Sequence, residues 1–200
     1  MRLYCATTNE GKLREFRLAM EAKFAVETLP GLAGITPCEE TGATFEENAI
    51  QKAVYYSKYS EEYVLVDDSG LEVNALDGAP GVYSARFAGP GASDAANNRL
   101  LLDRLRGVKD RTARFVCVVA LGRQGQLMRI FRGEVEGSIV TEPRGAGGFG
   151  YDPLFFYPPF GCTFGEVPLE RKMGVSHRAM ALRALGTWRL ARSFRSGPDR

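Results

Sequence analysis

Two pairs of adjacent acidic residues have the type and placement needed to bind a divalent cation. Glu39 and Glu40 stand just before a predicted turn, and Asp67 and Asp68 end an apolar run that begins at Tyr63. Carboxylate oxygens are the ligands that Mg²⁺ prefers, and the ion keeps several waters when it binds a protein. Successive side chains of a strand point to opposite faces, so we expect one aspartate to face a cleft. Turn formation and helix capping are the alternative.

The segment TTNEGK, residues 7–12, has the composition of a phosphate-binding loop. It lies between a predicted strand and a predicted helix, where free N–H groups and the helix dipole attract anions. Its threonines and Asn9 add donors, Gly11 permits close approach, and Lys12 adds charge. The P-loop pattern is absent, and a capped helix start with an exposed lysine is the alternative. Lys52, on the inward face of another predicted helix, could reach the same phosphate or extend to water.

Aromatic and cationic residues in the C-terminal third could bind a nucleobase. GGFGYDP places Phe149 and Tyr151 among glycines, where a flat ring could stack for about 1–3 kcal/mol. His177, the only histidine, and Arg178 begin a predicted helix, and Lys172 lies five residues before His177. The alternatives are a glycine-rich turn with two core aromatics and a histidine at the surface or in a helix cap.

Hydrophobic spacing and turn residues divide the chain into alternating strands and helices. Thr44 and Glu47 form a capping box at the start of the clearest helix. Predicted helices span about residues 9–23, 44–60, 94–107 and 176–195, and predicted strands span 2–6, 25–29, 63–70, 112–122 and 125–140. The strand at 63–70 ends in a turn, and 145–161 is loop-rich and aromatic. This order indicates an α/β fold with a mixed β-sheet.

Composition and charge limit the class of protein. The 200 residues, 44% hydrophobic, predict a single globular domain over 1–200, with 196–200 as a flexible tail. A net charge of +2 is too small to indicate nucleic-acid or membrane binding, although residues 171–200 hold eight Lys or Arg and one acid. The four cysteines form no zinc pattern, which fits a reduced, cytoplasmic protein. No apolar run suits a signal peptide or a membrane span.

Five segments of the chain, taken in order, resemble a known family. They are TTNEGK, EETGATFEENAIQKA, VDDSGLEVNALDGAPGVYSARFAG, GGFGYDPLF and SHRAMAL. From Arg2 to about Leu190 the chain resembles the inosine/xanthosine triphosphate pyrophosphatases, which hydrolyse non-standard purine nucleoside triphosphates (ITP, dITP and XTP) to the monophosphate and pyrophosphate. This activity cleanses the nucleotide pool and prevents incorporation into DNA and RNA. The resemblance implies a curved mixed β-sheet flanked by helices, two lobes with a central cleft, a Mg²⁺ cofactor and a homodimer.

The resemblance also implies a role for each matching residue. Thr7, Thr8, Asn9, Glu10, Gly11 and Lys12 would hold the triphosphate, Glu40 and Asp68 the metal, and Ser69 the nucleotide, while Phe149, Gly150, Tyr151, Asp152, Lys172, His177 and Arg178 would form the base pocket. Asp68 would act as general base, and Lys12 and Lys52 would stabilise the leaving pyrophosphate. Arg171, Met173 and Thr8 depart from the family pattern, which alters the electrostatics near Lys172 and the fit of the loop.

Hydrogen-bonding groups predict which bases such a pocket accepts. Hypoxanthine and xanthine carry an acceptor oxygen at C6, where adenine carries an amino donor. Arg178 has only donors and His177 can donate, so adenine would leave buried donors unpaired and be rejected. Guanine shares the C6 oxygen, so its exclusion must act at the C2 amino group.

Three other functions compete with this one. A pyrophosphatase selective for modified pyrimidines would use the same phosphate machinery. A non-catalytic nucleotide or nucleic-acid binder would use the basic C-terminal residues and show salt-dependent binding without turnover, but Glu40 and Asp68 argue against it. A small-molecule kinase is disfavoured by the missing P-loop. We expect no stable nucleic-acid binding and no membrane association.

Overall fold

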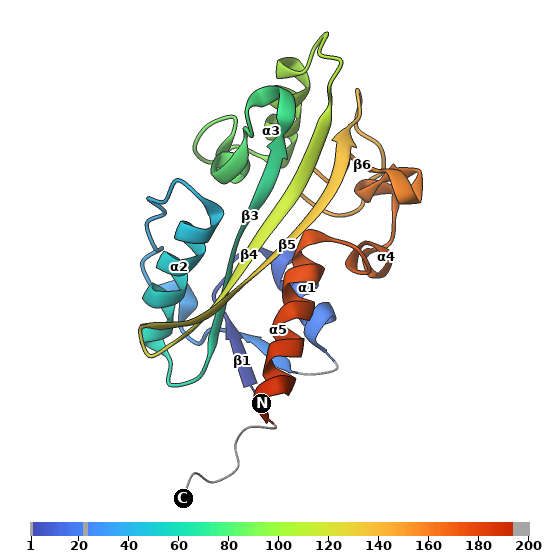
Figure 1. Cartoon of the computed structure of the whole chain (residues 1–200). Coiled ribbons are helices and arrows are strands. Elements are labelled where there is room, and N and C mark those ends of the chain that lie inside the picture. Colours follow the sequence, from blue (N-terminus) through green and yellow to red (C-terminus); the bar gives the residue numbers. More distant parts are fainter. Residues whose placement is uncertain (1, 22–23, 194–200) are drawn as a thin grey trace, which may run out of the picture.

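A seven-stranded mixed sheet forms the centre of the computed structural model, which describes residues 2–21 and 24–193, with side chains to residue 188 (Figure 1). The strands are β1 (Arg2–Cys5), β2 (Ala25–Thr28), β3 (Val64–Val73), β4 (Thr112–Arg123), β5 (Gln126–Ile139), β6 (Phe155–Tyr157) and β7 (Cys162–Thr163). Their order is β2-β1-β3-β4-β5-β6-β7. β1 runs parallel to β2 and β3, and the other neighbours are antiparallel. The mixed α/β sheet predicted from the sequence is confirmed.

Five α-helices flank this sheet in the described part of the chain. They are α1 (Glu10–Met20), α2 (Phe45–Tyr56), α3 (Asp94–Arg104), α4 (Leu169–Met173) and α5 (His177–Ser193). Asn9 caps α1 by accepting from the backbone N–H of Lys12 at 2.9 Å. The predicted capping box of Thr44 and Glu47 is present at the start of α2, where each side chain satisfies a backbone N–H of the other residue.

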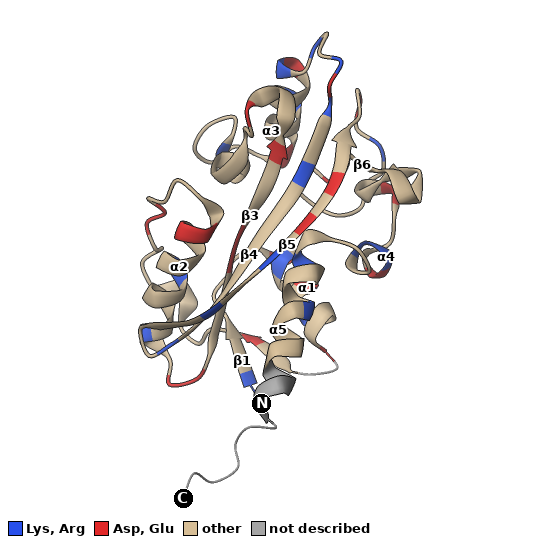
Figure 2. Ribbon diagram, viewed as in Figure 1, with Lys and Arg blue, Asp and Glu red and all other residues tan. Residues whose placement is uncertain are grey.

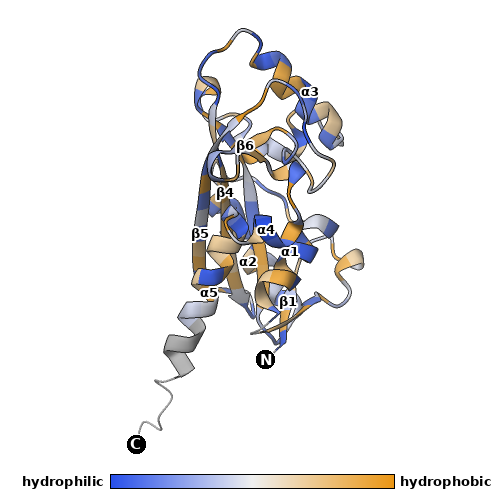
Figure 3. Ribbon diagram, turned by 90° about the vertical axis from the view of Figure 1, so that its right-hand side faces the viewer, coloured by the Kyte–Doolittle hydropathy of each residue, from blue (hydrophilic) through white to orange (hydrophobic). Residues whose placement is uncertain are grey.

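The helices at one end of the sheet cover both of its faces. In Figure 1, α2 lies on one side of the lower half, and α1 and α5 lie on the other. Leu65 of β3 packs in the cluster under α1 and α5, whereas Val64 and Val66 pack in the cluster under α2. The turned view shows apolar segments of the strands beneath these helices (Figure 3). Alternation along β3 therefore sends neighbouring side chains to different helices.

The other end of the sheet has a separate apolar cluster. Leu71, Leu101, Phe115, Phe155 and Phe164 belong to it, and they come from β3, α3, β4, β6 and the segment after β7. The long antiparallel pairing of β4 with β5 joins the two ends. The 3₁₀-helix η4 (Gly81–Arg86) packs beside β3 at this end. Residues from the two ends meet around the cavities described below.

Three local features differ from the sequence reading. The strand at 63–70 does not end in a turn, because Ser69 and Gly70 continue the ladder opposite Cys117 and Val116 and β3 runs to Val73. The segment 145–161 includes the short strand β6, and α4 was not predicted. The last helix begins at His177, which agrees with the prediction that His177 and Arg178 begin it. The predicted end at Arg195 and the expected tail at 196–200 lie outside the described residues.

Charges are spread over the elements and many are neutralised locally. Figure 2 shows acidic and basic positions next to one another on the upper parts of β3, β4 and β5. Arg114 lies 2.7 Å from Glu72 and 3.3 Å from Glu134 on the neighbouring strands. Among the described helices, none is long and apolar enough to cross a membrane.

Candidate active site

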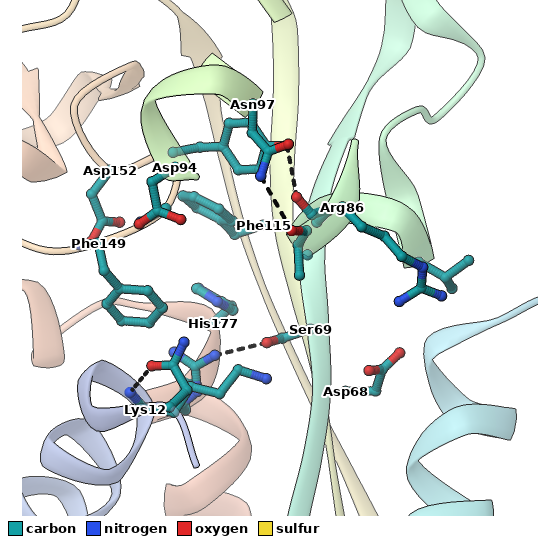
Figure 4. Close-up of a pocket in the computed structure, with 18 of the residues that line it drawn as sticks. Lys12, Asp68, Ser69, Arg86, Asp94, Asn97, Phe115, Phe149, Asp152 and His177 are labelled. Atoms are coloured by element: carbon teal, nitrogen blue, oxygen red, sulfur yellow. Dashed lines mark hydrogen bonds between the residues drawn. The ribbon is translucent and has the colours of Figure 1, made fainter. Parts of the chain in front are cut away.

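Nearly all of the residues singled out from the sequence line two adjoining cavities. The first, drawn in Figure 4, is lined by Asn9, Lys12, Glu40, Lys52, Asp68, Ser69, Phe149, Gly150, Tyr151, Asp152, Lys172, His177 and Arg178 from that set. The second is lined by Thr7 and Thr8 and shares Lys12, Glu40 and Lys52 with the first. Glu10 is exposed and lines neither cavity. Gly11 lines neither, but a Cβ there would lie 2.6 Å from the ring of Phe149.

The two aspartates of β3 serve opposite faces of the sheet. Asp67 lies on the face of Leu65, toward α1 and α5, and its Oδ1 is 3.1 Å from the ammonium of Lys12. Asp68 lies on the face of Val66, toward α2, and its Oδ1 is 2.7 Å from the ammonium of Lys52. The alternation predicted from the sequence is confirmed.

Asp68 belongs to a cluster that holds two carboxylates around one lysine. The ammonium of Lys52 lies 2.8 Å from Glu40, and the Asn48 amide donates to Asp68 at 3.3 Å. Burial raises the pKa of Asp68, and Lys52 only partly offsets that effect. Burial alone would lower the pKa of Lys52, but its acidic neighbours raise it above the ordinary value. Lys52 is therefore a permanent cation here. Arg86, not singled out from the sequence, lies 3.4 Å from Glu40.

The donor set of this cluster fits Mg²⁺. Glu40 and Asp68 converge on one ammonium, so their oxygens face a common point. No group of three His, Cys, Asp or Glu suited to a metal occurs within 2–21 and 24–193. A magnesium ion needs no such group, because it is commonly held by one or two carboxylates together with waters and substrate phosphates. Glu40 and Asp68 are thus the residues that could hold it.

Asp67 anchors a buried network instead of facing the first cavity. It accepts from Arg178 at 3.1 and 3.3 Å and from the Ser69 hydroxyl at 2.9 Å. Burial would raise its pKa, but Lys12 and Arg178 outweigh burial and hold that pKa well below its usual range. Asp67 therefore stays ionised and fixes the positions of three other polar side chains.

Glu15 is a network residue that the sequence reading missed. Its carboxylate pairs with the guanidinium of Arg178 and lies 2.8 Å from the ammonium of Lys172, which in turn lies 2.5 Å from Asp152. Glu15 is only 1% exposed, so these cations are what make its burial tolerable. Glu15 directly precedes Phe16, a residue on the apolar face of the predicted helix, and this adjacency was the signal available in the sequence.

His177 is held neutral and faces the first cavity. Its ring stacks on Phe115 with centroids 4.8 Å apart, and its Nδ1 is buried without a hydrogen-bond partner in the described part of the chain. Burial, with Arg178 and Lys172 nearby, lowers its pKa well below the ordinary value. A neutral imidazole has one donor and one acceptor nitrogen. It is therefore suited to hydrogen bonding with a ligand rather than to carrying charge.

The neutral state of His177 predicts a pH dependence of stability. The unfolded imidazole takes up a proton below about pH 6.5, while the folded one does not. The free energy of unfolding should therefore decrease as the pH is lowered below this value, by about 1.4 kcal/mol per pH unit. Because His177 is the only histidine, His177→Asn should remove that slope. Urea unfolding without nucleotide from pH 7 to 5 measures it. Parallel curves for wild type and variant would contradict the prediction.

The aromatic side of the cavity combines one accessible ring with one buried ring. The ammonium of Lys172 lies 5.0 Å from the centroid of the Phe149 ring, and the guanidinium carbon of Arg178 lies 5.7 Å from the same centroid. Tyr151 is buried, and its hydroxyl donates to the carbonyl of Ser84 at 2.9 Å. The ring open to a ligand is therefore that of Phe149, which Figure 4 shows at the cavity. Tyr151 forms part of the cavity wall.

The departures from the family pattern lie outside the first cavity. Arg171 stacks on the ring of Phe160, 4.2 Å from its centroid. Met173 is buried, and its sulfur accepts from the Ser176 hydroxyl at 3.6 Å. Thr8 is exposed at the second cavity. The charge environment of Lys172 is therefore set by Glu15 and Asp152 rather than by Arg171.

Fold and site together define the class of protein: a mixed α/β protein with a carboxylate–lysine cluster beside an aromatic, cation-bordered pocket. The model of the Ham1 family matches residues 3–188, and the chain belongs to this family. It is 50% identical over 193 residues to a dITP/XTP pyrophosphatase of Acidobacterium capsulatum, covering 92% of this chain and 95% of that protein. The family resemblance expected from the sequence motifs is thereby confirmed.

Solved structures agree with this assignment. The Ham1 protein of Staphylococcus aureus is 39% identical and superposes with a TM-score of 0.85, over 96% of this chain and all of that one. A protein of Mycobacterium abscessus described as a nucleoside-triphosphatase / dITP/XTP pyrophosphatase is also 39% identical, with a TM-score of 0.73 over 92% of this chain and 98% of that one. The curved sheet with flanking helices is thus the fold of this family.

Proposed function

We propose that this protein hydrolyses non-standard purine nucleoside triphosphates, dITP, ITP and XTP, to the monophosphate and pyrophosphate. One observation carries the proposal: a single cavity joins the Asp68–Lys52–Glu40 cluster to a pocket formed by Phe149 and His177. A hydrolytic centre and a ring-binding pocket are thus within reach of one nucleotide. The names of the relatives at about 50% identity support the same substrate class.

The phosphate chain fits the region where the two cavities join. Lys12 and Lys52 line both cavities, and the second cavity extends past them to Thr7 and Thr8. The start of α1 adds free backbone N–H groups and the positive end of its dipole. A triphosphate whose α-phosphate lies near Asp68 would place its terminal phosphates there. The two lysines would then stabilise charge on the leaving pyrophosphate.

Water attacks the α-phosphorus in the proposed reaction. Asp68 accepts a proton from that water while the bond from the α-phosphorus to the bridging oxygen breaks. Bound Mg²⁺ supplies polarisation of the phosphate and a lowered pKa for water. Glu40 and Asp68 would hold the ion, and Asn48 keeps the Asp68 carboxylate turned toward Lys52.

Arg178 is the proposed reader of the base. A guanidinium carries five N–H donors, and four hydrogen bonds from Arg178 go to Asp67, Ser69 and Glu15, which leaves one donor on Nη1. Hypoxanthine and xanthine can accept that donor at C6, whereas the amino group of adenine cannot. The buried network thus turns a flexible side chain into a fixed donor.

A panel of nucleotides tests this function. Pyrophosphate release from ITP, dITP, XTP, GTP and ATP should be fast for the first three, slow for the last two, and absent without Mg²⁺. The selectivity follows from hydrogen-bond matching at C6 and the metal requirement from the Glu40–Asp68 pair. Preferred hydrolysis of a modified pyrimidine triphosphate would replace the proposed substrate class, and metal-independent turnover would remove Glu40 from its role.

We also propose a cytoplasmic homodimer that does not bind nucleic acid stably. All four cysteines are unpaired, as a reducing compartment requires. Lys12, Lys172 and Arg178 are neutralised by buried acids and offer little charge to an external polyanion. The dimer rests on the family resemblance. Sedimentation tests it, and a gel-shift titration at low salt tests the absence of nucleic-acid binding.

A further inference from the structure

The backbone of Gly150, in the loop of the base pocket, is held at both of its polar groups by one helix. The Gly150 N–H donates to Oδ2 of Asp94 at 2.6 Å, and its carbonyl accepts from the amide of Asn98 at 3.0 Å. Gly150 has a φ of +61°, a conformation that other residues rarely adopt. Side chains of α3 therefore bind the two peptide groups that flank the Cα of Gly150, and Asp94 extends toward Phe149 in Figure 4.

The spacing of the two α3 residues and the burial of Asn98 make this contact specific. Asp94 and Asn98 are four residues apart, so they project from the same face of the helix one turn apart. Asn98 is only 9% exposed, and its Oδ1 has no hydrogen-bond partner in the part of the chain that the structure describes. Burying an amide costs free energy, and the bond to Gly150 is the side-chain hydrogen bond that offsets part of this cost for Asn98.

The two hydrogen bonds to Gly150 also restrain the residues on both sides of it. Oδ2 of Asp152 accepts from the Phe149 N–H at 2.9 Å, which closes the loop on itself. The ring of Phe149 presses against Gly11 at the start of α1, where even a methyl group would clash. A shift of Gly150 would consequently move the Phe149 ring relative to Lys172 and Arg178. Neither hydrogen bond to Gly150 comes from a residue of the Asp68–Lys52–Glu40 cluster.

We propose that Asp94 and Asn98 are positioning residues for base recognition: they hold the Phe149 ring at the distance from Arg178 that a purine needs. The proposal rests on the proposed function, because it concerns the base pocket of that same site. It assigns a role in substrate selection to α3, a helix outside the segments that bear the phosphate chemistry. Asn98 does not line the cavity and acts only through Gly150.

Four variants separate positioning from general damage to the fold. Asp94→Ala and Asn98→Leu each remove one hydrogen bond to Gly150, and Asp94→Asn keeps an acceptor at the same place. Asp103→Ala is the matched control, because Asp103 lies on the same helix and pairs with exposed Arg106. We expect kcat/KM for dITP to fall about tenfold in Asp94→Ala and Asn98→Leu, mainly through KM, and to stay within twofold in the other two.

Inhibition by inorganic tripolyphosphate distinguishes a role in base recognition from a purely structural role, which would weaken phosphate binding and base selection alike. This ligand has phosphates but no base, so its inhibition constant should change less than twofold in every variant, while the preference for dITP over dATP falls in Asp94→Ala and Asn98→Leu. Equal losses for dITP and tripolyphosphate would overturn the proposal. So would an unchanged dITP preference.

Amide hydrogen exchange tests, without any substrate, whether Asp94 and Asn98 hold the loop around Gly150 in place. Exchange in residues 147–152 should accelerate at least tenfold in Asp94→Ala and Asn98→Leu and match wild type in Asp103→Ala, whereas unchanged exchange would overturn the proposal. If wild-type protein turned over no purine triphosphate, the proposed function would fail. The exchange data would still decide whether α3 positions the loop.

Discussion

Asp68→Asn is expected to lower turnover of the preferred triphosphate about a thousandfold while leaving its binding within a few-fold of wild type. The asparagine keeps the shape of the side chain but cannot accept the proton of the attacking water. It also removes one of the two carboxylates that fit Mg²⁺. Lys52 keeps its partner Glu40 at 2.8 Å, so the cluster should not collapse.

Single-turnover kinetics and nucleotide binding by calorimetry, at matched Mg²⁺, measure the effect of Asp68→Asn. Asp77→Asn is a suitable control, because Asp77 is exposed, lines neither cavity and has a φ of 51° that asparagine readily adopts. Turnover of Asp68→Asn within tenfold of wild type would remove Asp68 from the role of base. Loss of nucleotide binding alone would make it a binding residue.

Arg178→Ala should abolish the preference for ITP over ATP and destabilise the folded protein. It removes the donor proposed to meet the C6 oxygen and leaves Asp67 without the guanidinium that covers it. Glu15 keeps only Lys172 as a cationic partner. Breaking a buried ion pair by removing one partner typically costs about 3–5 kcal/mol. The loss of stability should therefore accompany the loss of selectivity, and Lys12 should retain its own contact with Asp67.

Arg178→Lys separates these two effects. A lysine restores the positive charge but not the planar fork, so stability should return in part while selectivity stays low. Urea unfolding and the ratio of kcat/KM for ITP and ATP are the measurements, with exposed Arg14→Ala on α1 as control. An unchanged ITP/ATP ratio in Arg178→Ala would place base selection elsewhere, with His177 as the next candidate.

Local sequence signals determined the helix starts, the long hairpin and the order of the chemical motifs. Asn9 and the Thr44–Glu47 pair cap helices through contacts three residues apart, which any chain with these residues can form. The strand at 112–122 and its partner at 125–140 follow from hydrophobicity and an intervening turn. Alternation along a strand also predicted that Asp67 and Asp68 point apart, but not which partners each would meet.

Tertiary structure decided the rest, because those contacts join residues far apart in the chain. β3 continues past Gly70 only because β4 pairs with it, and Glu15 meets Arg178 across 163 positions through the packing of α1 against α5. Asn98 reaches Gly150 across 52 positions. Hydrophobic periodicity tells which face of an element is buried, but the neighbour on that face depends on the order of the strands and the path of the loops. For this protein the sequence by itself predicted which groups could react, and the tertiary structure decided which acid each cation contacts.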